Sequence, residues 1–264
     1  MNNENGGSMR FIAGLVSVSF RGLDRNKIIE LTKESGLAAI EWGGDIHVPA
    51  GEIEAAHITG EQTRENKLEV AEYGSYYRIG VTDPDEIHRV ASSARALGTH
   101  TVRVWAYNKG SADVTADEYE MAVSDARRIC AIYPDLTFCT ECHNNTLTDD
   151  YSANLRLLED VNMPNFAAFW QPNQYKSHEY NLEAVRAMAS YVKAIHVFAW
   201  EGNAKYPLAH HRDRWIEYLR AFAECCDENA NVALMLEFMH DNAPESLPAA
   251  AKTLKEIVGC LKIN

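Results

Sequence analysis

Residues 137–141 read TFCTE, an apolar, strand-like run that ends on a carboxylate, Glu141. Three later runs also end on a polar residue that can bind a divalent metal: FAAFWQ (166–171), VKAIH (192–196) and VALMLE (232–237). Each run is apolar enough to be buried, and each is followed by a loop and a helical pattern. Because the carboxyl ends of successive parallel strands meet at one face of a barrel, the four end residues are expected to converge on one point.

The same alternation of β-rich runs and helical patterns extends over the whole chain. Strands are predicted at 11–18, 37–42, 68–73, 101–105, 136–141, 166–171, 192–198 and 232–238. Helices are predicted at 24–35, 53–66, 84–97, 116–131, 149–160, 180–190, 210–228 and 244–258. Strands that are separated by helices pair in parallel through right-handed crossovers, so eight such units predict an α/β fold, the (β/α)8 TIM barrel. The structural alternative is a doubly wound open sheet, but the sequence has no GxGxxG after the first strand and no GxxxxGK[ST] loop.

The length of 264 residues fits one barrel domain. The first ten residues, MNNENGGSMR, are polar and lack the apolar core of a signal peptide. We therefore expect a disordered tail at 1–9 and a single barrel domain at 10–264. No apolar run reaches the length of a transmembrane helix, and the formal net charge of −13 would repel nucleic acid and anionic membranes. A cytoplasmic location without nucleic-acid or membrane partners is expected.

The four strand-end residues predict a metal site. Glu141, Gln171, His196 and Glu237 offer two carboxylates, one amide oxygen and one imidazole nitrogen. This donor set suits one divalent ion, Mn²⁺, Mg²⁺, Zn²⁺ or Co²⁺. Each residue alone has a simpler explanation, such as a helix cap or a hydrogen-bonded core histidine, but their coincidence at four successive strand ends favours a metal site.

Five segments resemble the xylose isomerase-like TIM barrels, a superfamily of sugar-phosphate isomerases and epimerases: GLAAIEWGGDIHVPAG (36–51), TECHNNTL (140–147), WQPNQ (170–174), KAIHVF (193–198) and LEFMHDN (236–242). In the family's ketose epimerases a divalent metal is held by Glu, Asp, His and Glu, and the two Glu also act as acid and base. The resemblance implies that Glu141, His196 and Glu237 bind the metal, and that Glu141 and Glu237 also act as acid and base. This chain departs from the family pattern at two positions. Gln171 stands where the family has the Asp, and Gln174 stands where the family has a following His.

The resemblance implies a metal-dependent isomerase or epimerase that acts on a small-molecule carbohydrate, such as a sugar, keto-sugar or polyol. The reaction would pass through a cis-enediolate held on the metal, with Glu141 and Glu237 as the catalytic acid–base pair. Two alternatives stay open: a lyase of the keto-inositol or dehydroshikimate dehydratase type on the same scaffold, and a non-catalytic sugar-binding barrel. Homo-oligomerisation is left open as well.

Further polar and aromatic residues lie at predicted strand ends, where they could contact a substrate. Aromatic faces stack on the C–H surfaces of sugars, and histidine, arginine and lysine can bond hydroxyl groups. The residues expected to bind substrate are His47, Arg103, Trp105, His143 and Lys205. The chain shows no clear phosphate cradle, which favours a substrate without phosphate.

Overall fold

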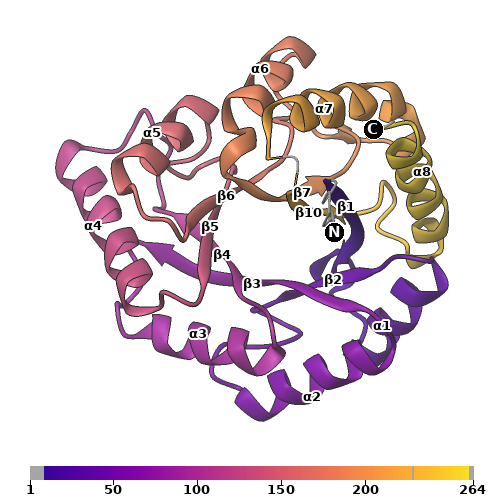
Figure 1. The fold of residues 1–264 in the computed structure, drawn as a ribbon, viewed down its shortest axis with the longest axis horizontal. Coiled ribbons are helices and arrows are strands. Elements are labelled where there is room, and N and C mark those ends of the chain that lie inside the picture. Colours follow the sequence, from indigo (N-terminus) through magenta and orange to yellow (C-terminus); the bar gives the residue numbers. More distant parts are fainter. Residues whose placement is uncertain (1–8, 228, 262–264) are drawn as a thin grey trace, which may run out of the picture.

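A computed structural model of the chain describes residues 9–227 and 229–261. Within them, eight parallel strands close into a barrel in the order β1-β10-β7-β6-β5-β4-β3-β2 (Figure 1). The strands are β1 (Arg10–Val16), β2 (Ala39–Gly43), β3 (Glu69–Ile79), β4 (Thr101–Ala106), β5 (Thr137–Glu141), β6 (Phe166–Trp170), β7 (Val192–Val197) and β10 (Asn231–Leu236). The predicted (β/α)8 barrel is confirmed.

The helices surround this barrel as an outer ring (Figure 1). In the described residues they are α1 (Arg25–Glu34), α2 (Ile53–Glu65), α3 (Glu86–Leu97), α4 (Ala116–Ile132), α5 (Tyr151–Val161), α6 (His178–Met188), α7 (Arg212–Cys225) and α8 (Leu247–Gly259). Short 3-10 helices lie at η1 (Ser17–Phe20), η2 (Ala189–Tyr191), η3 (Leu208–His211) and η4 (Pro244–Ser246). A small hairpin of β8 (Trp200–Glu201) and β9 (Ala204–Lys205) follows β7.

Local sequence signals fix where these helices begin and end. The side chain of Asp24 accepts a hydrogen bond from the backbone N–H of Lys27 and caps α1. Thr115 and Glu118 form a reciprocal capping box at the start of α4. At the end of α3, Gly98 takes a φ of +85°, a left-handed conformation that glycine adopts without a steric cost.

The apolar residues form two layers, one on each side of the barrel wall. The larger layer lies between the strands and the helices. The smaller one fills the barrel interior, mostly with small or β-branched residues that suit its narrow bore: Val16, Val18, Cys139, Ala167, Phe169, Ala194, Ala233 and Met235. The packed interior leaves the carboxyl ends of the strands as the place for a binding site.

Several predicted boundaries differ from the structure by a few residues, and three of these differences bear on the site or the core. The first strand ends at Val16 rather than at 18, because the chain turns there into η1. The third strand continues to Ile79, so residues 74–76 lie in the strand and not in a loop. Residues 1–8 of the expected tail lie outside the described residues, whereas Met9 is buried and packs with the outer layer.

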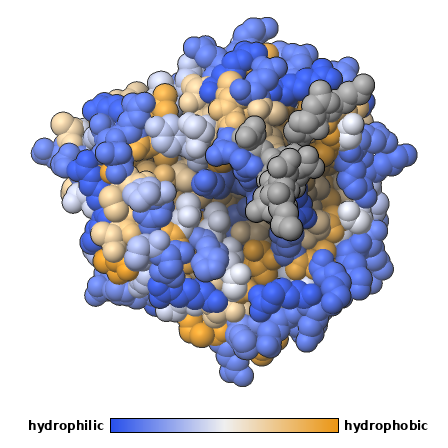
Figure 2. All heavy atoms as spheres, in the orientation of Figure 1, coloured by the Kyte–Doolittle hydropathy of each residue, from blue (hydrophilic) through white to orange (hydrophobic). Residues whose placement is uncertain are grey.

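Hydrophilic residues dominate the outline of the molecule in Figure 2. Among the described residues, none of the helices combines the length and the apolar composition that a bilayer crossing would take.

Helix α2 packs closely against α3 at Gly60, and this contact can be tested by mutation. A Cβ atom at Gly60 would lie 2.2 Å from the backbone oxygen of Leu97. Gly60→Ala should therefore lower the free energy of unfolding by about 1–3 kcal/mol, as overpacking does elsewhere. Gly259→Ala is the matched control, because a Cβ there meets no atom within 4 Å. Urea unfolding measures both, and equal stability of the two variants would contradict the close packing of α2 on α3.

Candidate active site

The structure brings the four predicted metal donors together. Glu141 is the last residue of β5, Gln171 directly follows β6, His196 lies in β7, and Glu237 directly follows β10. Ligand atoms of Glu141, His196 and Glu237 all lie within 4.8 Å of one another. The Oε1 atom of Gln171 lies 3.2 Å from Nδ1 of His196. The convergence expected from the strand ends is therefore present.

The donor atoms face one another because contacts with neighbouring groups orient the side chains. Gln171 donates a hydrogen bond from Nε2 to the backbone oxygen of Cys142 at 2.7 Å, which turns its Oε1 toward His196. Nδ1 of His196 lies 3.6 Å from an oxygen of Glu141 and 3.6 Å from an oxygen of Glu237. Three oxygens and one nitrogen thus surround a single position.

Glu41 of β2 holds the other side of the imidazole, and the sequence analysis did not assign it to the site. Its Oε2 lies 2.8 Å from Nε2 of His196, and both side chains are buried. With Nε2 engaged in this way, Nδ1 is the nitrogen left to bind a metal, as in carboxylate–histidine–metal arrangements. The available signal was a carboxylate inside the otherwise apolar run LAAIEW (37–42).

Gly74 of β3 makes room for that carboxylate. A Cβ atom at Gly74 would lie 2.5 Å from Oε1 of Glu41. The residue that pairs with Glu41 across the β2–β3 register is a second buried acid, Glu72. Burial and the neighbouring charge of Glu41 raise the pKa of Glu72 well above its usual value.

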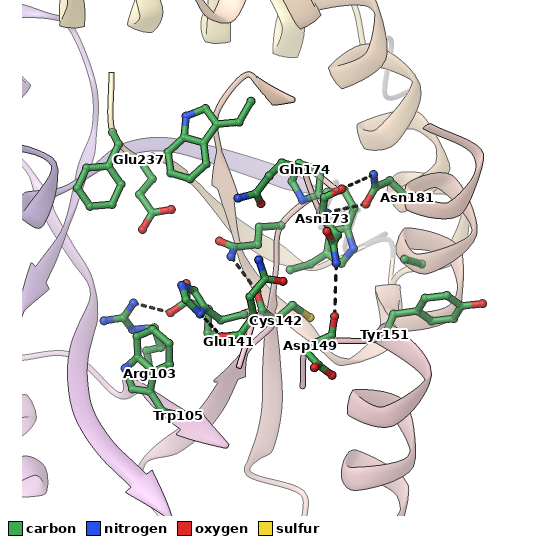
Figure 3. Close-up of a pocket in the computed structure, with 18 of the residues that line it drawn as sticks. Arg103, Trp105, Glu141, Cys142, Asp149, Tyr151, Asn173, Gln174, Asn181 and Glu237 are labelled. Atoms are coloured by element: carbon green, nitrogen blue, oxygen red, sulfur yellow. Dashed lines mark hydrogen bonds and ion pairs between the residues drawn. The ribbon is translucent and has the colours of Figure 1, made fainter. Parts of the chain in front are cut away.

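Arg103 of β4 is a buried cation between two of these carboxylates. Its Nη1 lies 2.5 Å from Oε2 of Glu141, and its Nε lies 3.7 Å from Oε1 of Glu41. Figure 3 shows the Arg103–Glu141 pair and the carboxylate of Glu237, which points toward it. Arg103 borders the pocket, as expected of a substrate contact, but its charged partners are the site's own acids, Glu41 and Glu141.

Burial and neighbouring charges shift the pKa values of Glu141, Glu237 and His196 in different ways. Burial raises the pKa of Glu141, but Arg103 and His196 outweigh it and bring the value to about 2. Burial, with the charges of Glu141 and Glu41, raises the pKa of Glu237 to about 7 against the opposing effects of His196 and Arg103. Burial lowers the pKa of His196, but the carboxylates of Glu237 and Glu41 raise it well above its usual value.

The charge of the buried cluster fits a divalent cation. Glu41, Glu141 and Glu237 carry three negative charges when ionised, and Arg103 carries one positive charge. With a neutral imidazole, two negative charges stay uncompensated, and buried charges need a partner. A divalent ion supplies the missing charge, and oxygen and imidazole donors are ligands that Mn²⁺, Zn²⁺ and Co²⁺ accept.

Three of the four donors, Glu141, Gln171 and Glu237, border a pocket of about 300 Å³ at the carboxyl end of the barrel (Figure 3). Trp105 and His143 also line it, as expected, and their rings meet edge to face at 4.7 Å. Lys205 lies behind the lining: its Nζ is 4.6 Å from the ring centroid of Trp200 and 5.2 Å from that of Phe238, two lining residues.

The structure does not place His47 at the pocket. Its ring nitrogens lie 3.0 Å from Oγ of Ser17 and 3.1 Å from the backbone oxygen of Leu23. The ring also packs edge to face on Trp42, and burial lowers its pKa. The expected substrate contact is replaced by a packing role, because the chain after β2 turns the ring toward η1.

A second group with metal-binding side chains lies at the β8–β9 hairpin. Glu201, His210 and His211 have ligand atoms within 4.8 Å of one another. A guanidinium already occupies the donors, because Nη1 of Arg214 lies 2.7 Å from Glu201 and 3.3 Å from His211. The strand-end cluster is therefore the better metal site.

The cluster predicts one divalent ion per chain and a pH-dependent affinity. A metal must displace the proton of the His196 imidazole, whose pKa is raised well above its usual value by the neighbouring carboxylates, so affinity should rise as the pH increases. Titration calorimetry with Mn²⁺ and Zn²⁺ measures this. His196→Ala should lose most of the affinity, whereas the exposed His57→Ala should keep it. Full metal binding by the His196 variant would refute the assignment.

The Glu41–His196 contact predicts a positioning role for Glu41. Glu41→Gln keeps the shape of the side chain but removes the charge that orients the imidazole, so metal affinity should fall about 10- to 100-fold. Glu69→Gln is the control, since Glu69 forms an exposed ion pair with Arg10. Competition with a chelating dye measures both. A Glu41 variant that unfolds more easily but binds metal normally would show that Glu41 serves packing alone.

Comparison with known proteins agrees with this architecture. The chain is 28% identical to a 3-dehydroshikimate dehydratase from Bacillus anthracis over 162 residues. This match spans 57% of the chain and 58% of the relative's length. The crystal structure of a probable 3-DHS dehydratase, AsbF, from the same species superposes with a TM-score of 0.76 at 22% identity, over 93% of this chain and 99% of that one.

Two further structures share the barrel. A D-psicose 3-epimerase from Clostridium cellulolyticum gives a TM-score of 0.70 at 15% identity, over 95% of this chain and 99% of that one. A xylose isomerase domain protein from Alicyclobacillus acidocaldarius gives 0.71 at 12% identity, with the same coverage. No protein-family model matches the chain. The structural matches nevertheless show that the chain has the fold of the xylose isomerase-like TIM barrels.

Proposed function

We propose that the chain is a metal-dependent dehydratase that removes water from a small polyhydroxylated carbonyl compound, with Glu237 as the base. The observation that carries this proposal is the unequal environment of Glu141 and Glu237. Two opposed bases would suit epimerisation, whereas one base is enough for elimination.

The inequality lies in the contacts of the two carboxylates. Oε2 of Glu141 pairs with the buried Arg103 at 2.5 Å, and its Oε1 faces His196 at 3.6 Å. Glu237 borders the pocket, and among the described residues its one ion-pair partner within 4 Å is His196, at 3.6 Å. Arg103 thus holds Glu141 as an anion, whereas Glu237 borders the pocket without an arginine or lysine partner and is the carboxylate better placed to accept and return a proton.

The reaction needs no oxidant or reductant. Glu237 takes a proton from the carbon next to the substrate carbonyl and then gives a proton to the hydroxyl group on the following carbon. One C–H bond and one C–O bond break, a C=C bond forms, and water leaves. A divalent metal at Glu141, Gln171, His196 and Glu237 would supply Lewis-acid polarisation of the carbonyl.

The relative that is named a 3-dehydroshikimate dehydratase supports an elimination of this kind. The second candidate is the isomerase or epimerase that the sequence resemblance implies. It is favoured by the structural similarity to a D-psicose 3-epimerase and by the placement of two carboxylates around one cluster. For two-base epimerisation, Arg103 would have to release Glu141.

The proposal predicts unequal effects of replacing the two acids. Glu237→Gln keeps an oxygen donor but removes the base, so kcat should fall about 10²- to 10⁴-fold. Assays use metal-loaded protein with 3-dehydroshikimate and a panel of keto-polyols, and follow the conjugated carbonyl product by ultraviolet absorbance. Glu245→Gln in η4 is a control for the loss of one carboxylate and should leave kcat unchanged.

The identity of the product separates the candidates. Elimination should give an unsaturated carbonyl compound and no epimer when the reaction is run in D₂O and read by NMR. Appearance of an epimer labelled with deuterium would support the second candidate instead. Normal turnover by the Glu237 variant would refute its role as the base in either reaction.

A further inference from the structure

The lining of the pocket carries positive as well as negative charge. Three arginines line the pocket, namely Arg21, Arg78 and Arg103. Arg103 pairs with Glu141 at 2.5 Å, and Arg21 pairs with Asp45 at 2.5 Å. Within residues 9–227 and 229–261, Arg78 has no carboxylate oxygen within 4 Å, although it is half-buried. It is the lining arginine whose charge is left for a ligand.

Arg78 is held in place by neutral groups. It lies near the end of β3, where its backbone N–H donates to Oγ1 of Thr82 at 2.8 Å. Its Nη1 donates to the backbone oxygen of Tyr107 at 3.1 Å, and its Cζ lies 4.8 Å from the ring centroid of Trp105. A guanidinium has five N–H donors, so most of them stay free. The side chain is thus oriented in advance without being neutralised.

Trp105 links this arginine to the reacting groups. The Cζ atom of Arg103, which holds Glu141, lies 5.3 Å from the centroid of the same ring. The indole Nε1 of Trp105 is buried and has no hydrogen-bond partner among the described residues. Arg78 therefore lines the same pocket of about 300 Å³ as Glu141, Gln171 and Glu237, with the ring of Trp105 between it and Arg103.

We propose that Arg78 binds a carboxylate group of the substrate, so that the substrate is a hydroxylated carbonyl acid rather than a neutral sugar. The planar fork of a guanidinium matches the two oxygens of a carboxylate. Lys205, the other cation near the pocket, donates to Oδ1 of Asn242 and packs behind Trp200, so it is less well placed. The inference rests on the proposed function only in taking this pocket as the substrate site.

The test measures binding without turnover. Shikimate and its methyl ester share one ring and the same hydroxyl groups and differ in the carboxylate charge. Titration calorimetry of the metal-loaded protein should show shikimate binding about 10- to 100-fold more tightly than the ester, as expected for a charge-assisted hydrogen bond. Equal affinities would overturn the proposal. Inorganic phosphate that displaces shikimate, where acetate does not, would overturn it in favour of a phosphate subsite.

Variants assign the preference to one side chain. Arg78→Gln should bind the acid and the ester equally, and Arg78→Lys should keep part of the preference because it keeps the charge. Arg156→Gln is the matched control, since Arg156 lies 4.3 Å over the ring of Tyr119 outside this pocket, and it should retain the full preference. A preference that survives Arg78→Gln would refute the assignment. Glu237→Gln should keep the preference whether or not the dehydratase proposal holds.

Discussion

The ion pair between Arg103 and Glu141 organises the carboxyl end of this barrel. Buried carboxylates are costly unless a positive group neutralises them. One arginine from β4 reaches Glu141 of β5 directly and comes within 3.7 Å of Glu41 from β2. Arg103 therefore determines which of the acids are neutralised by a cation of the protein. Glu237, on the far side of the cluster, depends on His196 and on whatever occupies the pocket.

The fold and the meeting of the four predicted donors follow from features that a sequence records directly. Strand–helix alternation predicts the barrel, and donors that end successive strands must meet because all carboxyl ends share one face. Glu141, Gln171, His196 and Glu237 needed no further information. Boundaries were less certain: β3 runs on to Ile79 because it pairs with β4 again at Arg78 and Ile79, after an irregularity that begins at Gly74.

The contacts behind the donors could not be predicted in the same way. Glu41 and His196 are 155 positions apart, and they meet only because the closed barrel brings β2 and β7 across from each other. The register shift between Ile40 and Glu41 helps to set the pairing of β2 with β3. His47 shows the converse, because its nearness to a strand end in the sequence says nothing about which way the following turn directs the ring.

The position of Glu237 on one side of the pocket has a stereochemical consequence under the proposed function. A single carboxylate that removes a proton and protonates the leaving hydroxyl group reaches only one face of the substrate. The two departing groups must then lie on that same face, so the elimination is suprafacial. Diastereomers whose hydroxyl group points to the other face would bind in the same pocket without reacting. The barrel would thus select its substrate by configuration as well as by charge and size.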